Sequence, residues 1–258
     1  MKLIKPALLL LIYIGTSLSL FGQQTPIDKL DLQQARFAFD SDLLYDDSIT
    51  SPEDFLGYPL GNRMTLYHQV VYYLQKLDEQ SERISMHNYG ETHEGRPLIY
   101  LVITHEDNHA RLEEIRANNL KLADPRTTSE TEAVEIMNNT PLVVSYSYNI
   151  HGNEASSTEA AMEVAYRLAA AKDAETEQLL KDLVFIAYVT VNPDGRDRYA
   201  YWYNSVAKSV VGTDPYELEH DAPWPNGRTN HYWFDLNRDW IWGVHPEMRG
   251  LTGIYQQW

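Results

Sequence analysis

Residues 141–171, PLVVSYSYNIHGNEASSTEAAMEVAYRLAAA, constrain the fold of this chain more than any other stretch. Pro141 to Asn149 are nearly continuously apolar and rich in Val and Tyr, which predicts a buried strand. Ser156 to Ala171 show apolar residues at helical spacing, which predicts a helix. The predicted helix face comprises Ala160, Ala161, Val164, Leu168 and Ala171. A strand that leads directly into such a helix is typical of an α/β fold.

The turn between this strand and helix is His151-Gly152-Asn153-Glu154. A His and a Glu at this spacing can aim an imidazole and a carboxylate at one point, and Gly152 leaves room for a close backbone approach. Ligands usually bind at the C-terminal ends of strands in open α/β sheets. Imidazole and carboxylate are ordinary zinc ligands. The turn is therefore a candidate metal site, although the same spacing is also common in polar surface residues.

Composition narrows the class of protein. The chain has 258 residues with 43% apolar and 22% charged content, so a folded core is expected. The net charge of -16 argues against a nucleic-acid surface, which needs basic patches. The chain contains no cysteine, which excludes disulfides, thiolate nucleophiles and lipidated cysteines.

The N-terminus has the pattern of a secretory signal peptide. Lys2 and Lys5 precede the short apolar run from Pro6 to Ile14, and Gly22 is a small residue at a suitable cleavage point. The run is too short for a comfortable membrane span, although an uncleaved anchor is the alternative. We expect residues 1–22 to be a signal peptide, so that the mature protein is exported to the periplasm or the extracellular space without a stable membrane span.

The remaining chain alternates between predicted strands and helices, which favours a mixed sheet flanked by helices. Residues 23–60 are predicted to be a poorly regular lead-in that docks on the domain formed by residues 61–258. Helices are predicted at 64–79, 108–123, 174–180 and from 250 onward, strands at 83–89, 97–104, 183–191 and early in 231–240, and a long loop at 211–230. His93 and Glu94 lie on the turn between two predicted strands, and we expect them to be solvated rather than to bind metal.

Two further polar stretches follow the His151 turn, and the three together resemble the zinc carboxypeptidases. The first is Asn192-Pro193-Asp194-Gly195, at the end of a predicted strand, and the second is 235–240, DLNRDW. The earlier stretch 89–98, YGETHEGRPL, is similar to a hairpin of that family. The resemblance covers roughly residues 64–240, and four motifs in the same order are more specific than any one of them.

The resemblance implies a role for each matching residue. His151 and Glu154 match the first two ligands of a single Zn²⁺ ion. Asn237 and Arg238 match the pair that binds the terminal carboxylate of the substrate, which suits the planar fork of an arginine. A structural ion pair of Arg238 with Asp235 or Asp239 is the alternative.

The arginine that polarises the scissile carbonyl is matched by Arg228, with Arg196 and Arg198 as competing candidates. The stretch Asn192-Pro193-Asp194-Gly195 is expected to be a structural turn beside the site rather than a catalytic element.

The sequence also departs from the family pattern. The family has a third zinc ligand, a histidine, and later a capping tyrosine and a general-base glutamate. His245 is the only histidine after Arg238, and it precedes a proline instead of ending an apolar strand. We therefore expect the third ligand, the general base and the C-terminal part of the sheet to lie beyond Trp258.

The sequence thus favours an exported zinc metallocarboxypeptidase that hydrolyses the C-terminal peptide bond of peptides or proteins. Its zinc would activate water and polarise the carbonyl. Two alternatives remain open at this point: a zinc deacylase or amidase that acts on small acylated amino acids, and a non-catalytic secreted binding domain of the same fold.

Overall fold

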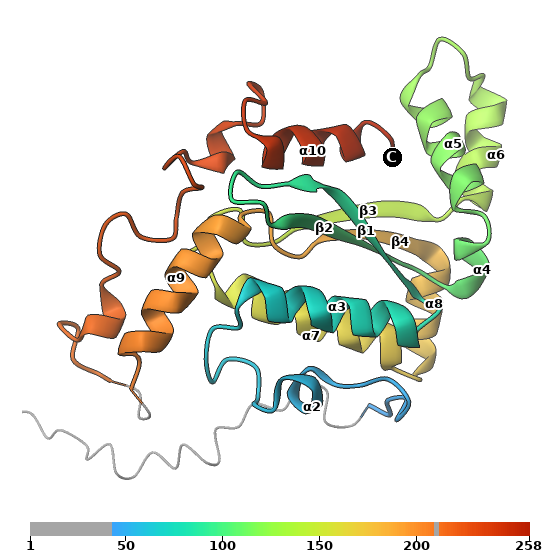
Figure 1. The fold of residues 1–258 in the computed structure, drawn as a ribbon. Helices are drawn as coiled ribbons and strands as arrows, with labels where there is room; N and C mark the ends of the chain where they lie inside the picture. The colour runs from blue at the N-terminus through green and yellow to red at the C-terminus, as the bar shows by residue number, and fades with distance from the viewer. Residues whose placement is uncertain (1–42, 209–211) are drawn as a thin grey trace, which may run out of the picture. The chain divides into compact units, whose positions relative to one another are not determined.

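A computed structural model describes residues 43–208 and 212–258 (Figure 1). The predicted signal peptide and the first part of the lead-in lie outside the described residues. The helices are α2 (Pro52–Leu56), α3 (Tyr67–Gln80), α4 (Glu106–His109), α5 (Leu112–Ala123), α6 (Glu130–Asn139), α7 (Ser156–Ala170), α8 (Ala174–Asp182), α9 (Pro193–Val206) and α10 (Pro246–Tyr255), with 3-10 turns η2 (Leu218–His220) and η3 (Leu236–Arg238). The strands are β1 (Ile84–Glu91), β2 (Pro97–Ile103), β3 (Leu142–Ser147) and β4 (Leu183–Tyr188).

The strands form one mixed sheet in the order β1-β2-β4-β3, as the α/β prediction requires. β1 and β2 are an antiparallel hairpin, β2 pairs antiparallel with β4, and β3 pairs parallel with β4. Helices α3 and α7 cover one face of this sheet, and α10 lies over the other (Figure 1).

Alternate residues of the strands fill two separate cores. In β2, Leu101 and Ile103 belong to the core beneath α3 and α7. Tyr100 and Val102 belong to the other core, with Met248 and Leu251 of α10. The sheet is therefore covered on both faces, and the turns that follow its strands are anchored to these two cores.

β3 is not the buried strand that its apolar sequence predicts. It lies at one edge of the sheet formed by the described residues, and its side chains are exposed or half-buried. Leu142 is 64% exposed and Tyr146 is 49% exposed. Composition gives the propensity of a strand but not its place in the sheet, because that place is set by pairing with segments distant in sequence.

Helix α7 also buries a face that differs from the predicted one. Ala161 and Leu168 are buried as expected, but Ala160 is exposed and Val164 is 42% exposed. The buried face instead comprises Thr158, Glu159, Ala161, Met162, Ala165, Leu168, Ala169 and Ala170. An alanine-rich helix has several faces of similar hydrophobicity, and here the polar pair Thr158 and Glu159 is buried because both side chains are hydrogen-bonded.

The stretch Asn192-Pro193-Asp194-Gly195, predicted to be a structural turn, forms the capped start of α9: the Asn192 side chain accepts a hydrogen bond from the backbone N–H of Gly195. The strand predicted early in 231–240 is wrong. The segment 231–240 contains no strand, because the Asn230 side chain accepts the backbone N–H groups of Tyr232 and Phe234 and closes a turn there.

Elsewhere the structure matches the sequence with small shifts. The predicted helix at 108–123 is divided into α4 and α5, and the helix predicted from 250 begins earlier, at Pro246. The described part of the lead-in docks through a bridge between Tyr45 and Ala171 and through α2. No helix within the described ranges is both long and apolar enough to cross a bilayer.

Candidate functional site

The His151 turn begins at the end of β3, where Asn149 takes a left-handed backbone conformation with φ of 55°. Asn adopts this conformation more readily than most residues. The Asn149 side chain donates to the carbonyl of His151 and accepts from the hydroxyl of Thr158 on α7. These bonds fix the path of the turn, and the sequence prediction had not singled out Asn149.

Three glycines allow three loops to pack against one another. A Cβ on Gly152 would overlap the backbone of Gly195, Arg196 and Gly227. A Cβ on Gly195 would overlap the carbonyl oxygens of Gly227 and Thr229. The predicted close approach at Gly152 is thus confirmed, and it joins the His151 turn to the start of α9 and to the loop that carries Arg228.

His151 is 6% exposed and has a carboxylate at each ring nitrogen. Its Nδ1 lies 2.9 Å from Oε1 of Glu154, and its Nε2 lies 3.0 Å from Oδ1 of Asp235. Histidines that bind metal commonly donate their other ring N–H to a carboxylate, which fixes the tautomer. Nδ1 and the half-exposed Glu154 carboxylate are the pair that can face an ion, and Asp235 occupies the orienting position.

Arg228 and Asp235 extend this arrangement. A guanidinium NH2 of Arg228 donates to Oδ2 of Asp235 at 3.0 Å. Partial burial raises the pKa of Asp235, but hydrogen bonds from Arg228 and from the backbone of Asn237, together with the charges of His151 and Arg228, lower it overall. Asp235 is therefore held as an anion, which suits it to accept the His151 N–H.

The competing arginines have structural contacts. Arg196 is fully buried and donates to the carbonyls of Ala155 and Thr65 and to Glu159. Arg198 donates to the carbonyls of Asn226, Thr229 and Asn230, and so holds the loop after residue 225. Of the three arginines, Arg228 has a partly exposed side chain, 42%, beside His151, which favours it as the one that meets a substrate.

Asn237 and Arg238 lie on η3, directly after Asp235, and both are exposed. Arg238 forms no ion pair with Asp235 or Asp239 within the described residues. Asp235 pairs with Arg228 and His151, and Asp239 accepts the backbone N–H groups of Val244 and His245. The Arg238 guanidinium donates only to the neighbouring Asn237 carbonyl, so most of its donors face solvent.

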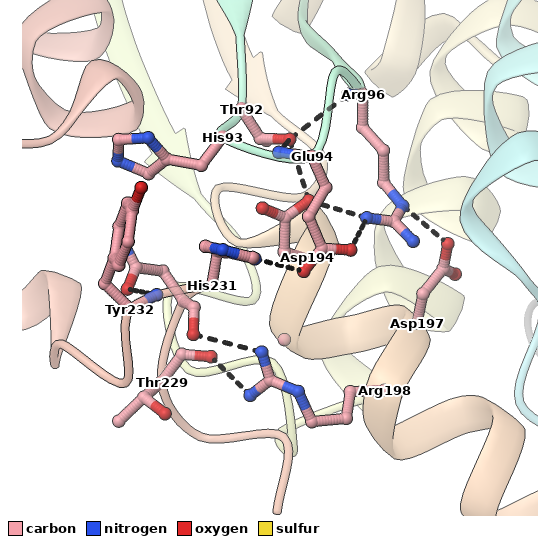
Figure 2. Close-up of polar contacts among 12 residues, drawn as sticks. Thr92, His93, Glu94, Arg96, Asp194, Asp197, Arg198, Thr229, His231 and Tyr232 are labelled. Atoms are coloured by element: carbon pink, nitrogen blue, oxygen red, sulfur yellow. Dashed lines mark hydrogen bonds and ion pairs between the residues drawn. The ribbon is translucent and has the colours of Figure 1, made fainter. Parts of the chain in front are cut away.

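A polar network supports the neighbouring rim of the site (Figure 2). Figure 2 shows Arg96, from the turn between β1 and β2, bridging Asp194 and Asp197 of α9. Thr92 also donates to Asp194, and Glu94 accepts from His231. Glu94 is therefore part of an ion-pair network, in which burial raises its pKa but hydrogen bonds from Arg96 and His231 lower it overall.

The donor set at His151 and Glu154 fits a zinc ion chemically, since it offers one imidazole nitrogen, one carboxylate and an orienting carboxylate behind the ring. Across the part of the chain that the structure describes, no third His, Cys, Asp or Glu groups with these two ligands. Groups of three such residues occur elsewhere, and one of them includes His93 and His245.

A comparison with protein-family models identifies the family, and a comparison with solved structures finds similar chains. A family model described as zinc carboxypeptidase matches residues 70–252. Solved structures that resemble the chain include carboxypeptidase A from Helicoverpa armigera, with 16% identity and a TM-score of 0.44 over 75% of this chain and 42% of that one. A metallo-carboxypeptidase from Burkholderia cenocepacia has 18% identity and a TM-score of 0.45 over 74% and 37%. Thrombin activatable fibrinolysis inhibitor has 14% identity and a TM-score of 0.47 over 80% and 46%.

The chain thus spans less than half the length of these three solved structures. No curated protein gives a significant match.

Proposed function

Since the chain belongs to the zinc carboxypeptidase family, we propose that it contributes to an exported metallocarboxypeptidase that cleaves the C-terminal peptide bond of peptides or proteins. The observation that carries the proposal is the pairing of His151 Nδ1 with Glu154 while Asp235 accepts at Nε2. This arrangement is the one expected of a zinc ligand with an orienting carboxylate. Export rests on the sequence pattern of residues 1–22.

His151 and Glu154 would hold a single zinc ion. When bound, zinc polarises a carbonyl oxygen and lowers the pKa of water. Asp235 keeps the His151 proton on Nε2, so that the Nδ1 lone pair remains available. Arg228, held by Asp235, would donate to the scissile carbonyl oxygen as negative charge develops there.

Asn237 and Arg238 would bind the terminal carboxylate of the substrate. An exposed guanidinium next to the Asn237 amide can offer a fork of donors to a carboxylate. A catalytic zinc normally has three protein ligands, of which His151 and Glu154 would supply two.

The metal part of this proposal is tested by zinc titration of the full chain. His151→Ala and Glu154→Gln should each weaken zinc binding at this site strongly, while His68→Ala, on the surface of α3, should leave it unchanged. Retention of the same zinc affinity by both site variants would refute the assignment.

The substrate part is tested by binding of a short peptide with a free C-terminus and of the same peptide with an amidated C-terminus. We expect the free carboxylate to bind about tenfold or more tightly, and Arg238→Lys to remove most of that difference, because a point charge cannot replace the bidentate fork. An equal loss for both peptides would indicate a folding role for Arg238. Preference for a small N-acylated amino acid over both peptides would favour a deacylase.

A further inference from the structure

A second group of metal-binding side chains lies between the β1–β2 turn and the start of α10. His93 comes from the turn, His245 is the residue that precedes α10, and Glu247 lies in the first turn of that helix. One ligand atom from each residue lies within 4.8 Å of the other two. The group contains neither His151 nor Glu154, so it is distinct from the proposed catalytic pair.

Glu247 is the feature of this group that the fold alone does not explain. Its side chain is fully buried, and neither carboxylate oxygen has a hydrogen-bond partner among the described residues. An unpaired buried carboxylate is costly, and such groups usually pair with a cation or coordinate a metal. Burial raises the pKa of Glu247, and the negative charges of Asp194 and Asp239 raise it further.

The two imidazoles face each other at a distance suited to a shared ion. Nε2 of His93 lies 3.1 Å from Nδ1 of His245. Two nitrogen ligands about 2.05 Å from a tetrahedral zinc ion are about 3.3 Å apart, so a small outward movement would admit the ion. Nδ1 of His245 is also 3.0 Å from the Asn230 amide, which would have to release it.

Surrounding contacts hold these ligands in place. The buried Asp239 accepts the backbone N–H of His245 and so fixes the segment that carries both His245 and Glu247. The ring of His93 packs edge-on against Tyr232 with centroids 4.7 Å apart, and Figure 2 shows the two side by side. His93 is exposed, which gives an ion a path from solvent to the buried carboxylate.

We propose that His93, His245 and Glu247 form a second metal site, which binds a divalent transition-metal ion such as zinc. Two imidazoles and one carboxylate are ligands that suit zinc and its neighbours in the first transition row. The ion neutralises the buried Glu247 carboxylate and joins the β1–β2 turn to α10. Without the ion, the same residues form a hydrogen bond between the two histidines beside a buried acid.

The test uses the full chain with Glu154→Gln as the parent, so that zinc held by the proposed catalytic pair does not contribute. After treatment with EDTA, each variant is dialysed against zinc and its metal content is measured. We expect about one zinc ion per chain in the parent. Glu247→Gln and His93→Ala should each raise the zinc Kd about 100-fold or more. Glu91→Gln, an exposed carboxylate at the end of β1, is the matched control and should not change the Kd.

Replacement of the exposed His93 should leave folding intact, so His93→Ala keeps the test valid if the buried Glu247 variant fails to fold. Visible absorption of bound Co²⁺ provides a second readout of the ligands. The proposal is overturned if the parent binds no zinc, or if both Glu247→Gln and His93→Ala retain it. The assignment of His151 and Glu154 as zinc ligands is tested separately in a Glu247→Gln background. If His151→Ala loses no zinc there, that assignment is wrong.

Discussion

Two glutamates in this protein are both buried, but only one of them has hydrogen-bond partners among the described residues. Glu159, on α7, is 6% exposed, and its carboxylate accepts from Arg196, from the backbone N–H of Thr65 and from the Thr65 hydroxyl. Glu247, at the start of α10, is fully buried and has no hydrogen-bond partner. Burial alone therefore does not reveal what a carboxylate does, whereas its partners do.

Glu159 is a structural group that holds several segments together, whereas the Glu247 carboxylate is available to bind a ligand. Arg196 joins Glu159 to the carbonyls of Ala155 and Thr65, so one buried ion pair ties together α7, α9 and the segment before α3. This junction lies directly behind the His151 turn. The Glu247 carboxylate forms no hydrogen bond to another element in residues 43–208 and 212–258, and we expect its protonation and metal binding to respond to pH and to zinc concentration.

The largest expected effect is that of Glu159→Gln. It removes the carboxylate that is hydrogen-bonded to the buried Arg196 guanidinium, and breaking a buried ion pair typically costs about 3–5 kcal/mol of unfolding free energy. Urea unfolding of the variant measures this loss. Glu135→Gln, on the exposed face of α6, should change stability by less than about 0.5 kcal/mol. Similar values for the two variants would mean that the ion pair is not part of the framework.

Glu247→Gln should stabilise the protein at neutral and higher pH, in contrast to Glu159→Gln, which should destabilise it. Burial raises the pKa of Glu247 from 4.5 to about 7; its own backbone N–H partly opposes this rise, and the charges of Asp194 and Asp239 add to it. A group whose pKa is raised in the folded state stabilises below its unfolded pKa, and that stability is lost as the pH rises through the folded value. The wild type should therefore lose about 3 kcal/mol relative to Glu247→Gln between pH 4 and pH 8.

This experiment is carried out in EDTA, and the difference between wild type and variant removes the contribution of other titrating groups. When Glu154→Gln is added to both proteins to remove the proposed catalytic pair, zinc should restore stability at pH 8 where Glu247 is present and not where it is Gln. A difference that does not change with pH would show that the buried carboxylate is already neutralised by a partner.

The comparison also shows what the sequence could and could not reveal. The spacing of His151 and Glu154 on a strand-turn-helix predicted that the two side chains would face each other, because those three elements are consecutive in the chain. The strand and helix positions were predicted for the same reason. The edge position of β3 and the role of Asp235 depend on segments about 40 to 80 residues away, which local periodicity does not place.

Glu247 could not have been recognised from its sequence context. An acidic residue after a proline in the first turn of a helix is ordinary N-terminal chemistry and is normally solvated. Its burial results from the packing of α10 on the sheet, through Met248 and Leu251. His93 lies on the turn between two strands as predicted, but its approach to His245 depends on tertiary structure.

The packing of the loops beside Glu159 and Arg196 also depends on Gly152. A Cβ at this position would overlap the backbone of three residues, none of which can rotate away as a side chain would. Gly152→Ala should therefore destabilise the protein by about 1–3 kcal/mol. Gly253→Ala, in α10 with open space around it, is the control and should be neutral or stabilise by up to about 1 kcal/mol. A harmless Gly152→Ala would contradict the tight packing of the three loops.

Asp235 lies between the two extremes, because it is paired but its side chain is 23% exposed. Asp235→Asn should change the free energy of unfolding by less than about 1 kcal/mol, because the side chain at this position is partly solvated in the folded protein.

The effect of Asp235→Asn on zinc affinity should be larger. An Asn amide can donate to His151 Nε2, which moves the ring proton to Nδ1 and blocks the lone pair that faces Glu154. Loss of an orienting carboxylate of this kind weakens metal affinity by about 10- to 100-fold. The measurement is a zinc titration in a Glu247→Gln background, which isolates the His151 site. Unchanged affinity would show that Asp235 serves only to hold Arg228, and the case for His151 as an oriented zinc ligand would then fail.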